Sequence, residues 1–179
     1  MTLLAGKTAV IVGASGDHNF GSAIARRLAA EGADVVVSAR RLEPLQQLAQ
    51  EISGTAVACD VGSEQEVEAL FSAATDAHGR VDIAVYSAGI HAPGMIAELT
   101  AEAMRPALEI SFIGALLFFK HAANAMTEGG SWEIKMIGRS SSLAEHIAQA
   151  TLPTLRGNEP VTATDGWAFG ISTTDRKKR

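Results

Sequence analysis

Residues 7–21 read Lys-Thr-Ala-Val-Ile-Val-Gly-Ala-Ser-Gly-Asp-His-Asn-Phe-Gly, an apolar run that passes directly into a loop containing glycines. The β-branched run ending at Val12 predicts a buried strand, and apolar residues at Phe20, Ile24 and Leu28 predict a helix after the loop. This order places backbone N–H groups at a helix N-terminus, where they can hold a pyrophosphate. The alternative is a βα turn without a ligand. The loop residues expected to bind are Gly13, Ser15, Asn19, Phe20 and Gly21.

The same alternation of strand and helix continues along the chain. Strands are predicted over 33–38, 55–59 and 81–86, and helices over 42–52 and after Ser63, which forms a capping box with Glu66. Strands that alternate with helices imply right-handed crossovers and a parallel sheet covered on both faces. The sequence therefore predicts a doubly wound α/β fold, as one domain over residues 1–179 with its core in 1–137.

The later part of the chain has weaker patterns. One helix is expected from Thr100 to Met126, with Pro106 as a kink or a boundary. A strand at 132–137 alternates apolar and charged residues, which is typical of a sheet edge rather than a centre. A further helix is predicted over 143–152, and the remainder has little periodicity.

Two arginines follow the second predicted strand, in the stretch Ser38-Ala-Arg40-Arg41. An acidic residue at this point of a dinucleotide site bonds the ribose hydroxyls of NAD. Arginine instead offers a fork of donors that matches a 2′-phosphate, so NADP(H) is favoured over NAD(H). The alternative is a pair of solvated arginines at the start of a helix.

Two further strand ends carry candidate cofactor residues. After the third strand, the Asp60 carboxylate can accept from an adenine amino group while Val61 packs on the ring, although Asp60 can equally cap the next helix. After the fourth strand, the small residues Ser87, Ala88 and Gly89 allow a close approach between backbone and cofactor.

Composition narrows the classes of partner. A net charge of -5 gives no basic surface for nucleic acid. The single cysteine, Cys59, fits a reducing compartment, so we expect a cytoplasmic protein. The scattered histidines predict no metal site, and the run 110–119 is too short to predict a membrane span. The helix around 110–126 is apolar over most of its circumference, which predicts a homo-oligomer.

Over roughly residues 3–131 the chain resembles the short-chain dehydrogenase/reductase family. The resemblance rests on the glycine loop, the Ser-Ala-Arg-Arg strand end, Cys59-Asp60-Val61, Ser87-Ala88-Gly89 and the stretch Ile110-Ser-Phe-Ile-Gly114. It implies a Rossmann-like sheet, an NAD(P)(H) cofactor and the oxidation or reduction of a small-molecule alcohol or carbonyl compound. Residues 138–179 resemble part of the family's late helix and tail.

The chain also departs from the family pattern. Asp17-His-Asn19 replaces the middle glycine of the loop, as in the divergent enoyl reductases of the same superfamily. The family's acid/base tyrosine is followed by a lysine, but Tyr86 is the only tyrosine and no lysine follows it at family spacing. Ser140 to Ser142 match the catalytic serine only loosely. The first hypothesis is an NADP(H)-dependent oxidoreductase whose catalytic segment is missing from this chain, through loss, disorder or gene rearrangement. The alternative is a noncatalytic dinucleotide-binding or oligomerising module.

Overall fold

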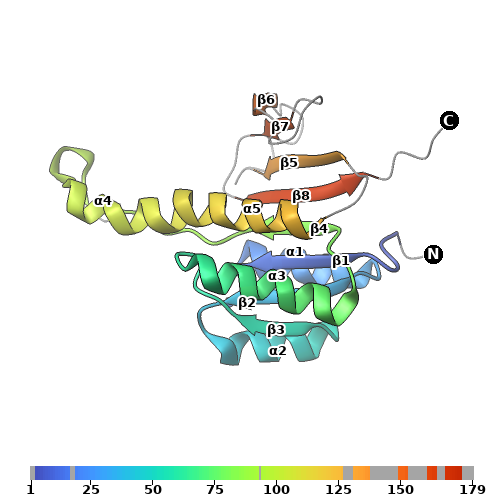
Figure 1. The fold of residues 1–179 in the computed structure, drawn as a ribbon. Coiled ribbons are helices and arrows are strands. Elements are labelled where there is room, and N and C mark those ends of the chain that lie inside the picture. Colours follow the sequence, from blue (N-terminus) through green and yellow to red (C-terminus); the bar gives the residue numbers. More distant parts are fainter. Residues whose placement is uncertain are drawn as a thin grey trace.

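The computed structural model describes residues 3–16, 19–92 and 94–126, and the backbone of strand segments at 131–137, 149–152, 161–164 and 168–174. Strands and helices alternate in its first part (Figure 1). The strands there are β1 (Thr8–Val12), β2 (Asp34–Ala39), β3 (Thr55–Ala58) and β4 (Ile83–Tyr86). The helices between them are α1 (Phe20–Ala30), α2 (Leu42–Ile52) and α3 (Glu64–His78). These elements confirm the predicted alternation.

The strand β1 lies between β2 and β4, and all three run parallel. Thr8 pairs with Asp34 at one end of β1, and Val12 at the other end pairs with Ser38 of β2 and Tyr86 of β4. The strand β3 continues the sheet beyond β2 in the same direction. The carboxyl ends of four strands therefore meet at one edge, where ligands bind in doubly wound sheets.

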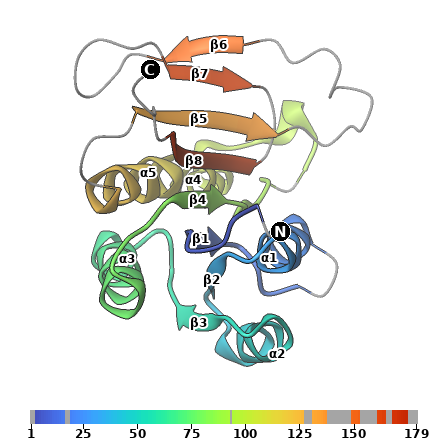
Figure 2. The ribbon, with the colours of Figure 1, turned by 90° about the vertical axis from the view of Figure 1, so that its right-hand side faces the viewer.

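Helices cover both faces of this parallel sheet, as Figure 2 shows. One face is packed by α1 and α2, and the other by α3 and a later helix, α5 (Gly114–Ala125). Successive side chains of a strand point to opposite faces, so β1 supplies both cores. Val10 and Val12 join the cluster with α3 and α5, while Ala9 and Ile11 join the cluster with α1 and α2. The doubly wound prediction is confirmed.

The predicted long helix consists of three segments. A short 3-10 turn at Ile96–Glu98 precedes α4 (Ala101–Leu108), which begins at its cap Thr100. A π-helical turn at Glu109–Ile113 then leads into α5. Pro106 lies inside α4, and the irregular turn begins only three residues after it. Pro106 thus neither ends the helix nor marks the exact position of the irregularity.

The later strands correct the sequence prediction. The strand β5 (Ser131–Ile137) lies at the end of the sheet order β3-β2-β1-β4-β8-β5, which confirms both the strand and its edge position. β8 (Ala168–Thr174) was not predicted, and it pairs antiparallel with both β4 and β5. The helix predicted over 143–152 is wrong at its end, because β6 (Gln149–Leu152) is a strand paired antiparallel with β7 (Val161–Thr164). β-branched residues in β7 favour this pairing, and residues 143–148 lie outside the described chain.

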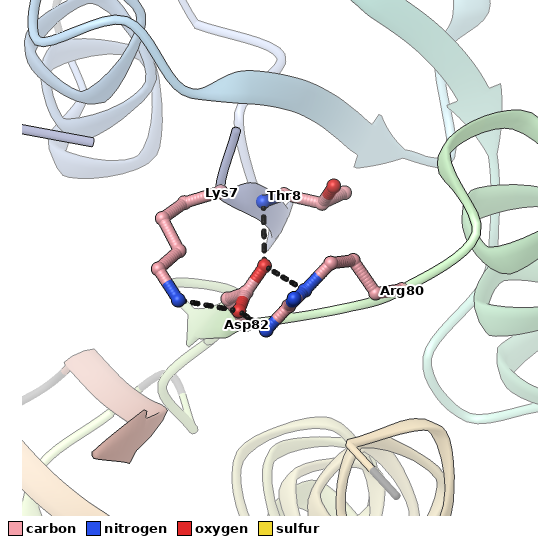
Figure 3. Close-up of polar contacts among 4 residues, drawn as sticks. All are labelled: Lys7, Thr8, Arg80 and Asp82. Carbon is pink, nitrogen blue, oxygen red and sulfur yellow. Dashed lines mark hydrogen bonds and ion pairs between the residues drawn. The ribbon is translucent and has the colours of Figure 1, made fainter. Parts of the chain in front are cut away.

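A buried carboxylate joins the amino ends of β1 and β4 (Figure 3). Asp82 accepts hydrogen bonds from the backbone N–H of Thr8 at 3.0 Å, from Lys7 Nζ at 3.1 Å and from Arg80 Nε at 2.9 Å. Burial alone would raise the pKa of Asp82, but the Thr8 N–H and the two cations outweigh burial and leave this pKa below its usual value. The charged cluster lies at the amino ends of β1 and β4, whereas the glycine loop lies at the carboxyl end of β1. Its bonds fix the register of β1 and β4.

Candidate functional site

The glycine loop leaves β1 in a conformation that requires glycine. Gly13 has a φ of 83°, and a Cβ at this position would lie 2.5 Å from the carbonyl carbon of Ser87. The N–H groups of Gly13 and Ala14 both donate to the carbonyl of Ser38, at 2.8 and 3.2 Å. The loop after β1 is therefore attached to the end of β2 and lies directly on the segment that follows β4.

Asn19 fixes the width of this loop. Its side-chain Nδ2 donates to the carbonyl of Gly13 at 2.8 Å, while its Oδ1 accepts from the N–H of Ser22 at 2.8 Å and so caps α1. Asn19 was predicted to contact the cofactor, but both ends of its amide bond the protein backbone. The structure thus shows Asn19 bonding the backbone at Gly13 and Ser22, and its contact with a cofactor stays a prediction.

The start of α1 carries two of the predicted loop residues. Phe20 is half exposed at the first helical position, and a Cβ on Gly21 would lie 2.7 Å from the carbonyl oxygen of Gly13. The N–H of Ser22 is used by the Asn19 cap. The N–H groups of Phe20 and Gly21 are the first-turn donors that no hydrogen bond uses within the described part of the chain. Donors in this position suit an anion.

The predicted arginines lie at the same edge of the sheet. Arg41 is the N-cap residue of α2, and its Nη2 donates to the carbonyl of Ser15 at 3.3 Å. Arg40 and Arg41 are both exposed. The structure thus brings Arg41 and Ser15, predicted from two separate motifs, into direct contact. Arg40 lies at the end of β2, and no contact of its side chain within the described residues separates the cofactor role from that of a solvated arginine.

Asp60 forms a turn between β3 and α3. Its Oδ1 accepts from the N–H of Gly62 at 3.0 Å, and its own N–H donates to Glu66 Oε2 at 2.8 Å. The N-cap of α3 is Ser63, whose hydroxyl accepts from the N–H of Glu66. The alternative in which Asp60 caps the helix is therefore wrong, although one of its carboxylate oxygens is engaged in the turn. Val61 is buried and belongs to the core cluster with α3 and α5.

The segment Ser87–Gly89 follows β4, as predicted, and its backbone lies against Gly13 of the glycine loop. The N–H of Ser87 donates to the carbonyl of Val12 at 3.1 Å. A Cβ on Gly89 would meet only Ser111 Oγ, at 3.7 Å, which is an ordinary contact. The protein's own atoms therefore leave room for a side chain at Gly89, and a requirement for glycine there stays a prediction about the ligand.

The chain's one tyrosine is not placed for acid/base chemistry. Tyr86 is buried in the core, and its hydroxyl donates to the backbone carbonyl of Ile110. Burial is the largest cause that raises the pKa of the Tyr86 phenol above its ordinary value, followed by the neighbouring ionisable groups of Cys59 and Asp60. A phenol held in this way is a poor proton donor to a substrate. Ser140 to Ser142 lie outside the described residues.

Two expectations about partners can be compared with the described chain. No group of three His, Cys, Asp or Glu side chains in that part is arranged to hold a metal ion. The continuous helix Ala101–Ala125 is long and apolar enough to cross a membrane, by length and composition only, and a third of its most apolar stretch is buried. Phe118 and Ala122 of this helix pack in the core beside α3, as in the core helix of a globular domain. The absence of metal and membrane partners stays a prediction.

Comparison with known proteins gives consistent matches. A family model described as enoyl-(acyl carrier protein) reductase matches residues 13–151. The chain is 36% identical over 133 residues to the Mycobacterium tuberculosis (5R,7aS)-5-hydroxy-7a-methyl-1-oxo-2,3,5,6,7,7a-hexahydro-1H-indene-carboxyl-CoA reductase, covering 67% of this chain and 50% of that protein. It is 34% identical over 140 residues to human dehydrogenase/reductase SDR family member 4, covering 75% and 50%. The crystal structure of an actinorhodin polyketide ketoreductase variant with NADPH superposes with a TM-score of 0.62 at 34% identity, covering 66% of this chain and 47% of that one.

The fold and the glycine loop define a doubly wound α/β protein with a site of the dinucleotide-binding type. The matches show that the chain belongs to the short-chain dehydrogenase/reductase family. It spans about half the length of the curated relatives that it matches.

Sequence reasoning missed two contacts at this site. The hydroxyl of Tyr86 bonds the backbone of Ile110, and the hydroxyl of Ser111 bonds both backbone groups of Ile90. The only sequence signal for the first contact is a large aromatic residue at the end of a predicted strand, directly before the small residues 87–89. The partner residues lie more than 20 positions away, and no local pattern pairs them.

Proposed function

We propose that this chain is the dinucleotide-binding part of an NADP(H)-dependent oxidoreductase that acts on a small-molecule alcohol or carbonyl compound. The observation that carries the proposal is the contact between Arg41 and Ser15, which places an exposed guanidinium directly over the glycine loop. A guanidinium there can pair with a 2′-phosphate while the loop holds the pyrophosphate. The named relatives are reductases and dehydrogenases, and one related crystal structure contains NADPH.

The residues present fit such a cofactor. A Cβ at Gly13 or Gly21 would fill space inside the loop, so the two glycines keep the backbone close to any bound phosphate. The N–H groups at the start of α1 would hold the pyrophosphate, and the carboxylate of Asp60, at the end of β3, would accept from the adenine amino group. When bound, the nicotinamide would supply hydride transfer to a carbonyl carbon or accept hydride from an alcohol carbon.

Proton transfer requires an acid/base group, and Tyr86, the chain's one tyrosine, is not placed to provide it. Tyr86 is buried with its hydroxyl on a backbone carbonyl. We therefore propose that this chain on its own binds dinucleotide without turning over carbonyl substrates at rates near those of intact relatives. This observation favours the second candidate function, a noncatalytic dinucleotide-binding module. NADPH consumption with a panel of aldehydes and ketones separates the two, because removal of an acid/base group typically costs about 10²- to 10⁴-fold in rate.

Isothermal titration with NADPH and NADH tests the cofactor proposal. The unmodified chain should bind NADPH more tightly, and Arg41→Ala should weaken NADPH binding by about tenfold because a charge-assisted pair is lost. Binding of NADH should change little in this variant. Arg27→Ala is the matched control, because Arg27 is an exposed arginine of α1 that pairs with Glu31. Equal affinity of the unmodified chain for NADH and NADPH contradicts the proposal.

Self-association is the second part of the proposal. Four large apolar side chains are exposed along the long helix, namely Leu108, Phe112, Ile113 and Leu116. Leu108, Phe112 and Leu116 recur every four residues, so they share one helix face. We propose that a second copy of the chain covers this face. Phe118 of the same helix is fully buried in the core and takes no part in this face.

A further inference from the structure

The side chain of Tyr86 connects the end of β4 to the long helix. It is 1% exposed and packs edge-on against Phe118, with ring centroids 5.4 Å apart. A buried phenol needs a hydrogen-bond partner for its O–H. Here the partner is the backbone carbonyl of Ile110, which lies in the π-helical turn between α4 and α5.

The backbone of that turn explains how the carbonyl becomes available. In a regular α-helix the N–H of Gly114 would donate to the carbonyl of Ile110. In this structure the N–H of Gly114 donates instead to the carbonyl of Glu109, one residue further back. The widened turn therefore releases the Ile110 carbonyl from its usual α-helical partner, and the phenol takes that place.

Gly114 makes room for this contact. A Cβ at Gly114 would lie 2.9 Å from the hydroxyl oxygen of Tyr86 and 2.9 Å from the carbonyl oxygen of Val61. Any side chain at this position would push the phenol away from the helix. The tyrosine, the glycine and the π-helical turn thus form one arrangement.

The next residue of the turn makes a second connection. Ser111 Oγ accepts from the N–H of Ile90 at 3.3 Å and donates to the carbonyl of Ile90 at 3.0 Å. Residues 110 and 111 are therefore bonded to residues 86 and 90, at the two ends of the segment Ser87–Gly89. The backbone of that segment lies against Gly13 of the glycine loop.

We propose that Tyr86 is a positioning residue. Its hydroxyl holds the π-helical turn open at Ile110 and so places Ser111 on Ile90, which fixes the backbone of Ser87–Gly89 against the Gly13 loop. Tyr86 acts through these neighbours and touches no substrate or cofactor itself. Only the affinity measurement below rests on the proposed function, because the exchange measurement needs no ligand.

The test compares Tyr86→Phe with the unmodified chain by amide hydrogen exchange and by NADPH titration. Exchange in residues 87–90 and 109–115 should become faster by about tenfold, because the bond that anchors the turn is gone. The affinity for NADPH should fall by about fivefold. Leu48→Ala and Ile52→Val are the controls, since they loosen the packing of α2 in the other core cluster. When these variants lower Tm by as much as Tyr86→Phe does, exchange in residues 87–90 and 109–115 and the affinity for NADPH should stay unchanged.

Unchanged exchange in 87–90 overturns the proposal, and so does faster exchange accompanied by unaltered affinity. If Tyr86→Phe does not fold, Ser111→Ala decides, because it removes only the second connection. It should speed exchange in 87–90 alone, and unchanged exchange there overturns the proposal. If the unmodified chain binds no NADPH, the proposed function fails, and the exchange measurement by itself decides the role of Tyr86.

Discussion

The carboxylate of Asp82 accepts a hydrogen bond of 3.0 Å from the backbone N–H of Thr8, which lies 74 positions earlier in the chain. Replacement of Asp82 by Ala leaves this buried N–H without a partner and should lower the free energy of unfolding by about 2–3 kcal/mol. Asp82→Asn keeps an acceptor and should cost less. Urea denaturation at neutral pH measures both variants.

The lowered pKa of Asp82 also predicts that the free energy of unfolding depends on pH in the acid range. Because the pKa of Asp82 is lower in the folded chain, its stabilising contribution is complete above the carboxyl pKa of the unfolded chain, about 3.9. The contribution is lost as the pH falls through the lower pKa of the folded state. The difference in unfolding free energy between the unmodified chain and Asp82→Asn should therefore shrink below about pH 4. A constant difference down to pH 2 contradicts this assignment.

The raised pKa of Tyr86 predicts a loss of stability at alkaline pH. The folded chain raises the pKa of this phenol above its unfolded value of about 10, so the tyrosine stabilises the fold below that pH and loses this effect as the pH rises. Since Tyr86 is the only tyrosine, its absorbance near 295 nm reports one group. We expect this absorbance to rise together with the loss of circular dichroism. Ionisation of the phenol at pH 10 in a chain that stays folded contradicts its burial.

Gly13 and Gly79 offer a matched pair of substitutions. Both have positive φ angles, 83° and 77°, but a Cβ at Gly79 meets nothing within 4 Å whereas one at Gly13 collides with Ser87. Gly79→Ala should cost about 1–2 kcal/mol, which is the left-handed backbone penalty alone. Gly13→Ala adds a steric clash and should cost about 2–5 kcal/mol while removing dinucleotide binding. Equal losses in the two variants would mean that the Ser87 contact is absent in solution.

If the exposed face of the long helix mediates self-association, charged substitutions on it should lower the mass of the oligomer. Phe112 is 61% exposed and Leu116 is 56% exposed. Phe112→Lys and Leu116→Lys should therefore change the free energy of unfolding by no more than about 0.5 kcal/mol. Each should shift the mass from light scattering toward that of one chain. Leu3→Lys is the control, since Leu3 is 82% exposed and lies outside this helix. A monomeric unmodified chain rules out association, and Phe118→Lys should simply unfold it.

The N-terminal half of the fold could be predicted because local patterns determine it. Ala9–Val12 is continuously apolar because β1 is buried on both faces, and Ser63 caps α3 as its spacing to Glu66 predicted. The small residues 87–89 were predicted to lie at the carboxyl edge of the sheet, and the structure places them there, beside Gly13. These features depend on periodicity or on the topology of parallel strands.

Other features depend on pairings that no local pattern contains. Gln149–Leu152 is too short for its apolar spacing to distinguish a strand from a helix, and its strand partner begins nine residues later, at Val161. The bond from Asn19 to Gly13 and the bond from Tyr86 to Ile110 require knowledge of where backbone carbonyls point. Such carbonyls are identical at every residue, so the sequence cannot distinguish them.

The amide of Asn19, which bonds Gly13 and Ser22 at the two ends of the loop, has a consequence for the kinetics of ligand capture. A flexible loop must lose conformational entropy when a ligand orders it, and that loss subtracts from affinity. For the Gly13 carbonyl and the Ser22 N–H this ordering takes place during folding, because Asn19 already bonds both groups. If the donors at the start of α1 bind the proposed dinucleotide, we expect an association rate that is set by diffusion and orientation rather than by ordering of these two backbone groups.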